Sequence, residues 1–147
     1  MGEVYCEDVN GPADIAWDEL RSRARVATRR SYAPYSHVRV GAAALTSDGR
    51  VIEGSNVENA SFGLTLCAEC SLVSDLARHG GGRLVAVAVV AGDGEPLAPC
   101  GRCRQILFEF GGSALLVDAG AGAAPIPLGD LLPDAFGPGD LDQRRSE

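Results

Sequence analysis

A run of eight apolar residues, 84–91, restricts the fold of this chain more than any other segment. It reads Leu-Val-Ala-Val-Ala-Val-Val-Ala, whereas a strand with one face in water alternates apolar and polar residues. The run is also much shorter than the roughly 20 apolar residues that a membrane-spanning helix needs. We therefore expect it to be the central strand of a sheet that helices cover on both faces.

Patterns on either side of this strand predict an alternation of helices and strands. The predicted elements, in chain order, are an amphipathic helix over 14–30, strands over 38–46 and 50–57, a helix from about Cys67 to His79, the strand over 84–91, a helix over 101–110, and strands over 114–118 and about 125–128. The last strand is expected to be antiparallel because its connection is too short for a helical crossover. This order predicts an α/β fold, a three-layer α/β/α sandwich with a mixed five-stranded sheet.

Length and charge limit the class of protein. At 147 residues the chain is expected to form a single domain over 1–147, with 1–13 and 140–147 flexible. Thirteen basic residues against twenty acidic ones give a net charge of -7, which argues against a nucleic-acid partner because such binding relies on Lys and Arg. No apolar run has the length of a signal peptide or a membrane span, so we expect a cytoplasmic protein without a membrane partner.

Four of the five cysteines form two Cys-x-x-Cys pairs, Cys67/Cys70 and Cys100/Cys103. Four thiolates would make a closed structural zinc site, whereas a catalytic zinc has three protein ligands and one open position. The gap between the pairs is longer than the roughly 15 to 20 residues of common four-cysteine sites. Glu69 stands two residues after Cys67, and Pro-Cys-x-x-Cys follows, as in zinc deaminases. The pattern therefore favours a catalytic site.

The predicted positions of Cys67 and Cys100 at the starts of helices suit metal binding. Unpaired backbone N–H groups and the helix dipole at such positions favour a thiolate over a thiol. Three thiolates and Zn²⁺ leave one net negative charge, which the helix termini, with Arg102 or Arg104, are expected to offset. Glu69 would then move protons from water to a ring nitrogen and to a leaving amine.

Each candidate residue also has a simpler interpretation. Alone, Glu69 would be a surface carboxylate at a helix start, and only the flanking motifs favour catalysis. Cys70 is expected to be a small buried helix residue, because three other cysteines complete a catalytic set, and Cys6 is expected to take no part. Asn56 and Glu58 can point to one side of an extended chain and hold a sugar hydroxyl, although spacing alone favours a polar turn.

Six short motifs follow one another along the chain: Tyr35-Ser36-His37, Val40-Gly41-Ala42-Ala43, Asn56-Val57-Glu58-Asn59-Ala60, Cys67-Ala68-Glu69, Pro99-Cys100-Gly101-Arg102-Cys103-Arg104-Gln105 and Leu132-Pro133-Asp134-Ala135-Phe136-Gly137-Pro138. Together, over most of residues 15 to 141, they resemble the small homotetrameric zinc-dependent cytidine deaminases. The resemblance implies hydrolytic deamination of cytidine and 2'-deoxycytidine to uridine and 2'-deoxyuridine, with release of ammonia.

The same resemblance implies roles for individual residues and a cofactor of one Zn²⁺ per subunit. The implied site residues are Glu69 for catalysis, Cys67, Cys100 and Cys103 for the metal, Asn56 and Glu58 for the ribose 3'-hydroxyl, and the backbone near Ala60 and Ala68 for further contact with the nucleoside. Phe136 would reach into a neighbouring subunit's pocket. The implied partner is therefore a second copy of the chain, in a homotetramer with shared active sites.

Three positions depart from the family pattern. Family members usually carry Phe at Val38, where the ring packs on the pyrimidine, and commonly Tyr at Phe62, where the hydroxyl helps bind the sugar. Many carry Arg at Cys70, beside the ligand thiolates. A modified cytosine nucleoside is therefore an alternative substrate, as in blasticidin-type deaminases, although those relatives lack the Asn-x-Glu pair that Asn56 and Glu58 form here. A four-cysteine module without catalysis and an enzyme that edits nucleic acid are further alternatives.

Overall fold

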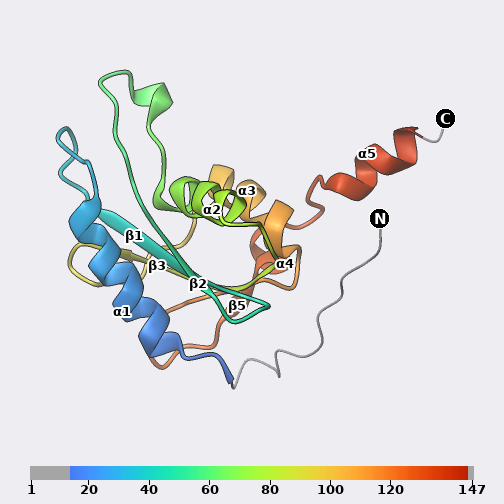
Figure 1. Ribbon diagram of the computed structural model, residues 1–147, viewed down its shortest axis with the longest axis horizontal. Coiled ribbons are helices and arrows are strands. Elements are labelled where there is room, and N and C mark those ends of the chain that lie inside the picture. Colours follow the sequence, from blue (N-terminus) through green and yellow to red (C-terminus); the bar gives the residue numbers. More distant parts are fainter. Residues whose placement is uncertain (1–13, 146–147) are drawn as a thin grey trace.

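The computed structural model describes residues 14–145. Segment 1–13, which contains Cys6, and residues 146–147 lie outside this range, so the expected flexibility of 1–13 stays a prediction. Residues 140–145, also expected to be flexible, belong to the last described helix. The described helices and strands are α1 (Trp17–Ala27), β1 (Val40–Thr46), β2 (Val51–Ser55), α2 (Ala68–Arg78), β3 (Leu84–Ala91), α3 (Gly101–Gly111), β4 (Leu116–Val117), β5 (Ile126–Pro127), α4 (Leu128–Leu131) and α5 (Pro138–Arg145), most of them labelled in Figure 1. Short 3-10 turns cover Thr28–Arg30 and Phe62–Leu64.

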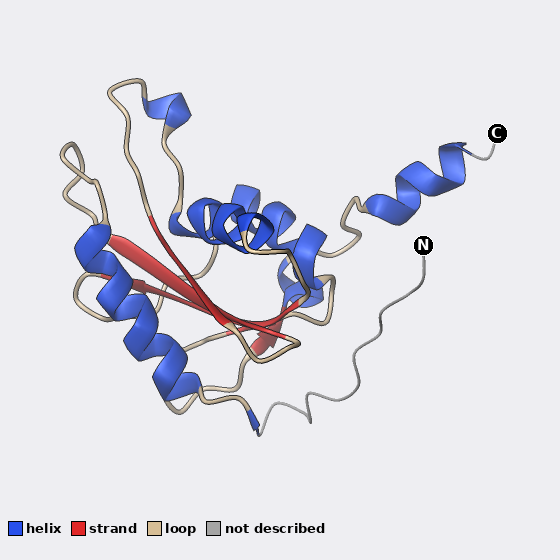
Figure 2. Ribbon diagram, in the orientation of Figure 1, coloured by secondary structure: helices blue, strands red, loops and turns tan. Residues whose placement is uncertain are grey.

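The strands form one mixed sheet in the order β2-β1-β3-β4-β5. Strand β1 pairs antiparallel with both β2 and β3, β3 runs parallel to β4, and β5 returns antiparallel to β4. Helix α1 covers one face of the sheet, and α2 and α3 cover the other (Figure 2). The predicted three-layer sandwich with five mixed strands, and the central place of β3, are confirmed.

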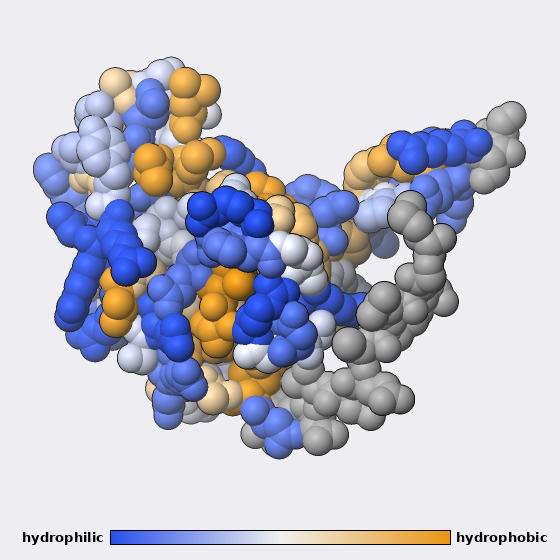
Figure 3. Space-filling model, in the orientation of Figure 1, coloured by the Kyte–Doolittle hydropathy of each residue, from blue (hydrophilic) through white to orange (hydrophobic). Residues whose placement is uncertain are grey.

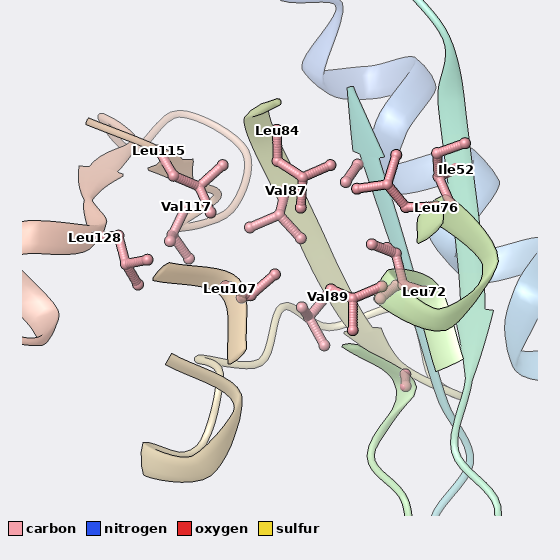
Figure 4. Close-up of a cluster of buried hydrophobic side chains, with 14 residues drawn as sticks. Ile52, Leu72, Leu76, Leu84, Val87, Val89, Leu107, Leu115, Val117 and Leu128 are labelled. Atoms are coloured by element: carbon pink, nitrogen blue, oxygen red, sulfur yellow. The ribbon is translucent and has the colours of Figure 1, made fainter. Parts of the chain in front are cut away.

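The apolar run of β3 contributes to two cores because successive side chains of a strand point to opposite faces. Val87 and Val89 join the cluster under α2 and α3, with Leu72, Leu76 and Leu107 (Figure 4). Leu84 belongs to the same cluster. Ala86, Ala88 and Val90 instead belong to a second cluster on the α1 side of the sheet, whose other members are Ile15, Leu20, Ala24 and Ala43. Burial on both faces is the reason why this strand contains no polar residue.

Two glycines allow the helices to approach the sheet closely. A Cβ atom at Gly41 of β1 would lie 1.9 Å from the Ala24 carbonyl oxygen of α1. A Cβ at Gly54 of β2 would lie 2.2 Å from the Ala68 carbonyl oxygen, in the first turn of α2. Since Glu69 stands in that turn, Gly54 helps to set where the acid group lies relative to the sheet.

Several boundaries differ from the sequence prediction. Helix α1 is shorter than 14–30 because its end tightens into the 3-10 turn, and β4 and β5 have two residues each. Helices α4 and α5 were not predicted. Helix α5 begins at Pro138, a residue that suits a first helical position, and the Asp140 carboxylate accepts the Gly137 N–H at 2.8 Å. It buries no residue and extends away from the sandwich (Figure 1), so no apolar pattern marked it.

Candidate active site

The two predicted helix starts bring three thiols together. Cys67 and Cys100 are the N-cap residues of α2 and α3, each with extended backbone, and Cys103 lies buried in the first turn of α3. The Sγ atoms of these three residues all lie within 4.8 Å of one another, with Cys67 and Cys100 3.9 Å apart. Three sulfurs bound to one tetrahedral zinc at 2.3 Å would stand about 3.8 Å apart. The cluster is therefore able to hold one metal ion.

Cys70 is not part of this group of metal-binding side chains in residues 14–145. Its side chain is buried in α2, and its backbone N–H donates to the Cys67 carbonyl at 3.0 Å, as in a regular first turn. Three thiols with a free fourth position are typical of a catalytic zinc site rather than a closed structural one. The geometry thus favours the catalytic alternative over a four-cysteine module.

Burial and helix termini affect the thiols differently. Burial raises the pKa of Cys67 to about 11 and raises the pKa of Cys103 further. Burial also opposes ionisation of Cys100, but N–H groups at the start of α3 and neighbouring thiols outweigh it and lower its pKa. The expectation that a helix start favours the thiolate is therefore met at Cys100 and wrong for Cys67. Buried thiols with raised pKa values ionise when a cation binds them, which fits a metal site.

Arg102 and Arg104, which were expected to help offset the charge of the thiolates, donate hydrogen bonds to backbone carbonyls. Arg102 donates to the Thr65 carbonyl at 3.2 Å, and Arg104 donates to the carbonyls of Pro99 and Leu131, each at 2.9 Å. Arg102 therefore holds the loop that precedes α2, and Arg104 links the loop that precedes α3 to the end of α4.

Glu69 lies beside the thiols in the first turn of α2. Its side chain is buried, with 3% of the residue exposed, and burial raises the pKa of its carboxyl group. It lines a cavity of about 200 Å³ together with Cys67 and Cys100. A buried carboxyl group with a raised pKa, adjacent to a candidate metal cluster and open to a cavity, is suited to proton transfer.

The remaining walls of this cavity are mostly apolar. They include Ala68, which the resemblance had indicated, and Val40, Leu66, Val89 and Leu97. Leu66 and Leu97 were not predicted from the sequence as site residues. Each pairs with a neighbouring segment through its backbone, Leu66 with Val57 and Leu97 with Val89. An apolar residue in an otherwise polar loop, shortly before each cysteine motif, was the signal that could have found them. A small, mainly apolar cavity with few polar groups is typical of a small-molecule site.

Asn56 lines the cavity, and its side chain also holds the segment that leads into β1. Its Oδ1 accepts the Val40 N–H at 2.9 Å and the Ser31 hydroxyl, while its Nδ2 donates to the Val38 carbonyl at 2.9 Å. The Glu58 carboxylate accepts the N–H groups of Tyr35 and Ser36 and the Ser36 hydroxyl. The Ser36 hydroxyl, followed by these N–H groups, lowers the pKa of Glu58.

Five residues that the resemblance places near substrate lie outside the cavity walls described in this single chain: Val38, Glu58, Ala60, Phe62 and Phe136. The exposed fractions of Val38, Phe62 and Phe136 are 53%, 74% and 54%. Phe62 lies on the segment between β2 and α2, which projects from the sandwich in Figure 1, and apolar groups are exposed on that projection in Figure 3. Its ring packs edge-on against Tyr35, with 6.1 Å between centroids.

Comparison with known proteins agrees with this geometry. Residues 16–118 match the family described as the cytidine and deoxycytidylate deaminase zinc-binding region. A cytidine deaminase of Mycobacterium tuberculosis is 58% identical over 132 residues, which cover 90% of this chain and 98% of that protein. The chain belongs to the cytidine deaminase family.

Other cytidine deaminases agree in sequence and in structure. One from Halalkalibacterium halodurans is 43% identical, over 76% of this chain and 87% of its own length. The crystal structure of the Mycobacterium tuberculosis cytidine deaminase aligns with a TM-score of 0.81, covering 84% of this chain and 99% of that one, and the Mycobacterium leprae cytidine deaminase with 0.78, covering 82% and 100%. As in those cytidine deaminases, the fold is α/β. Within residues 14–145, no helix is long and apolar enough to cross a membrane.

Proposed function

We propose that this chain is a zinc-dependent enzyme that hydrolyses cytidine and 2'-deoxycytidine to uridine and 2'-deoxyuridine with release of ammonia. One observation carries the proposal: a buried carboxyl group, Glu69, lines the same small cavity as Cys67 and Cys100, two members of the three-thiol cluster. Relatives that are 58% identical over most of the chain bear the name cytidine deaminase. We infer that Cys67, Cys100 and Cys103 hold one Zn²⁺ per chain.

The chemistry divides between the metal and Glu69. When bound, zinc lowers the pKa of a water molecule, which makes the water a better nucleophile near neutral pH. Glu69 removes a proton from the water that adds to C4 of the base and delivers it to N3. A second proton passes through the same carboxyl group to the amino nitrogen, the C4–N bond breaks, and ammonia leaves. The raised pKa of Glu69 suits both directions of transfer.

Two measurements test this function. One is the loss of the cytosine absorbance band when the protein is incubated with cytidine, and the other is the zinc content of the purified protein. We expect about one zinc per chain, and turnover that yields uridine and ammonia. Glu69→Gln should retain zinc and lose roughly 10²- to 10⁴-fold in kcat, because it removes a general acid–base group. Glu109→Gln, on the exposed side of α3, is the matched control and should keep full activity. A zinc-loaded protein without turnover, or an active Glu69→Gln variant, would refute the assignment.

We propose that residues inside the cavity and residues on nearby loops together bind the substrate. Asn56 and Glu58 would bind the ribose 3'-hydroxyl, and backbone near Ala60 and Ala68 would contact the nucleoside. Asn56 and Ala68 support this because they line the cavity. A modified cytosine nucleoside is a second candidate substrate, favoured by the small and exposed side chain of Val38. A panel of C5-substituted and sugar-modified cytosine nucleosides separates the two.

We also propose a homotetramer in the cytoplasm, in which Phe136 of one subunit completes the pocket of another. The 54% exposure of Phe136 in the single chain supports this, as does the location of Phe62 on a projecting segment. Light scattering should give four times the chain mass of 15.2 kDa. Phe136→Ala should retain zinc and lose about tenfold in kcat/KM, because an aromatic contact to substrate disappears. A fully active monomer would contradict the shared pocket.

A further inference from the structure

The two oxygens of the Glu58 carboxylate differ in the hydrogen bonds that they accept. Its Oε2 accepts the N–H groups of Tyr35 at 2.9 Å and Ser36 at 3.2 Å. Its Oε1 accepts the Ser36 hydroxyl, and the Ser36 N–H lies at a long 3.4 Å. A carboxylate oxygen has two lone pairs. Oε1 therefore has one short bond, from the Ser36 hydroxyl, and one long bond from an N–H group that also donates to Oε2, so its second acceptor position is only weakly occupied.

The direction of the Ser36 hydroxyl proton follows from a second bond. The Val38 N–H donates to Ser36 Oγ at 3.0 Å, so this oxygen acts as an acceptor toward Val38 and directs its own proton to Glu58. His37 lies between the two bonded residues with φ at 60°, in the left-handed region. This turn brings the Val38 N–H back to the hydroxyl, and the exposed His37 ring is not needed for either bond.

The same hydrogen bonds reach the wall of the cavity. The Val38 carbonyl accepts Asn56 Nδ2 at 2.9 Å, and Asn56 Oδ1 accepts the Val40 N–H at 2.9 Å. Both Asn56 and Val40 line the cavity. Ser36 thus stands at one end of a continuous network whose other end lines the cavity, and Glu58 accepts a hydrogen bond from Ser36 at the first end. A hydrogen bond to a charged carboxylate is stronger than one between neutral groups, so the hydroxyl is well suited to fix the carboxylate rotamer.

We propose that Ser36 is a positioning residue for sugar recognition: its hydroxyl holds the Glu58 carboxylate so that the weakly occupied position on Oε1 accepts the 3'-hydroxyl of the nucleoside. The proposal rests on the proposed function, because it takes Glu58 as a ligand of the sugar. It adds a residue that never touches the substrate. Without the hydroxyl, the carboxylate keeps its backbone bonds on Oε2 but loses the contact that orients Oε1.

Comparison of cytidine with 3'-deoxycytidine in Ser36 variants tests this role. Ser36→Ala should lower kcat/KM for cytidine about tenfold, mainly through KM, since it weakens one charged hydrogen bond. For 3'-deoxycytidine, which lacks the hydroxyl concerned, the same variant should change kcat/KM less than about twofold. Ser36→Thr keeps a hydroxyl at this exposed position and should restore cytidine turnover. Ser22→Ala, an exposed serine on α1, is the matched control and should behave as the unsubstituted chain.

A second comparison removes Glu58 itself. In a Glu58→Gln background, Ser36→Ala should have little further effect on the ratio of kcat/KM for cytidine to kcat/KM for 3'-deoxycytidine. The effects of two residues that act through one another do not add. If Ser36→Ala lost kcat/KM equally on both substrates, or if Ser36→Thr did not restore cytidine turnover, the role of Ser36 would be merely structural and the proposal would be overturned. An unsubstituted enzyme that deaminates both nucleosides equally well would remove Glu58 as a sugar ligand while leaving the deaminase function intact. A protein inactive on every cytosine nucleoside would overturn the function and this proposal together.

Discussion

The metal half of the candidate site is held by packed helices, whereas its substrate rim lies on exposed loops. The metal half, Cys67, Glu69, Cys100 and Cys103, lies on the first turns of two helices that pack against a fully buried sheet. The rim, Val38, Ala60, Phe62 and Phe136, lies on loops and projecting segments with exposed side chains. In the proposed function, chemistry therefore depends on residues that the packed interior of one chain holds in place. Recognition depends on loops that the interior does not fix, and two of the three departures from the family pattern, Val38 and Phe62, lie there.

Replacement of a clustered thiol should have the largest effect. We expect Cys103→Ala to lose bound zinc and at least about 10³-fold in turnover, because two thiols cannot form a stable catalytic zinc site. Cys70→Ala is the matched variant: it removes a buried thiol from the same helix start, and should keep zinc while losing about 1 kcal/mol of stability. Zinc analysis and calorimetry measure both. Zinc loss from Cys70→Ala would restore the four-cysteine alternative.

Two glycine substitutions compare the rigidity of the two regions directly. Gly54→Ala would place a Cβ 2.2 Å from a backbone oxygen of α2, and we expect it to lower the free energy of unfolding by about 3 kcal/mol. Gly63→Ala lies in the projecting segment with no atom within 4 Å, and should change stability by less than about 0.5 kcal/mol. Denaturant unfolding of both variants checks the contrast. Similar decreases in the free energy of unfolding for the two variants would mean that the projecting segment is packed as tightly as the interior.

A restored aromatic residue on the rim should have a moderate effect. Val38→Phe is expected to raise kcat/KM on cytidine by about two- to tenfold, the equivalent of about 0.5 to 1.5 kcal/mol of aromatic contact. The measurement is steady-state kinetics on cytidine and on a C5-substituted cytidine in parallel. Unchanged or lower efficiency on cytidine, with a loss on the substituted base, would favour the modified nucleoside as substrate.

The pH dependence of stability gives the smallest expected effect. The pKa of Glu58 is lowered in the folded chain, first by the Ser36 hydroxyl, so its ionised form stabilises the fold above the ordinary glutamate pKa. That contribution disappears as pH falls through the lowered pKa. We expect the stability of the unsubstituted chain to fall more steeply than that of Glu58→Gln below about pH 4.3. Thermal unfolding of the two proteins across this range measures the difference, and parallel curves would contradict it.

How far the sequence predicts this molecule depends on how local the cause is. The β3 run and the cysteine spacing are local, and they predicted the central strand, the helix starts near Cys67 and Cys100, and the buried position of Cys70 in its helix. Helix α5 was missed because it buries nothing, and the raised pKa of Cys67 because burial outweighs the helix terminus there. The bonds from Asn56 and Glu58 to segment 31–40 depend on long-range packing, which spacing alone does not reveal.

Alanine dominates the middle of the sheet, where Ala42, Ala43, Ala44, Ala86 and Ala88 are all completely buried. A methyl side chain has no rotamers, so these positions lose no side-chain entropy on folding and offer nothing that can rearrange. The distance between the layers is consequently set by backbone contact. Directed evolution toward new nucleosides should spare this layer, where any added methylene forces helices apart, and diversify the exposed loops around the cavity mouth instead.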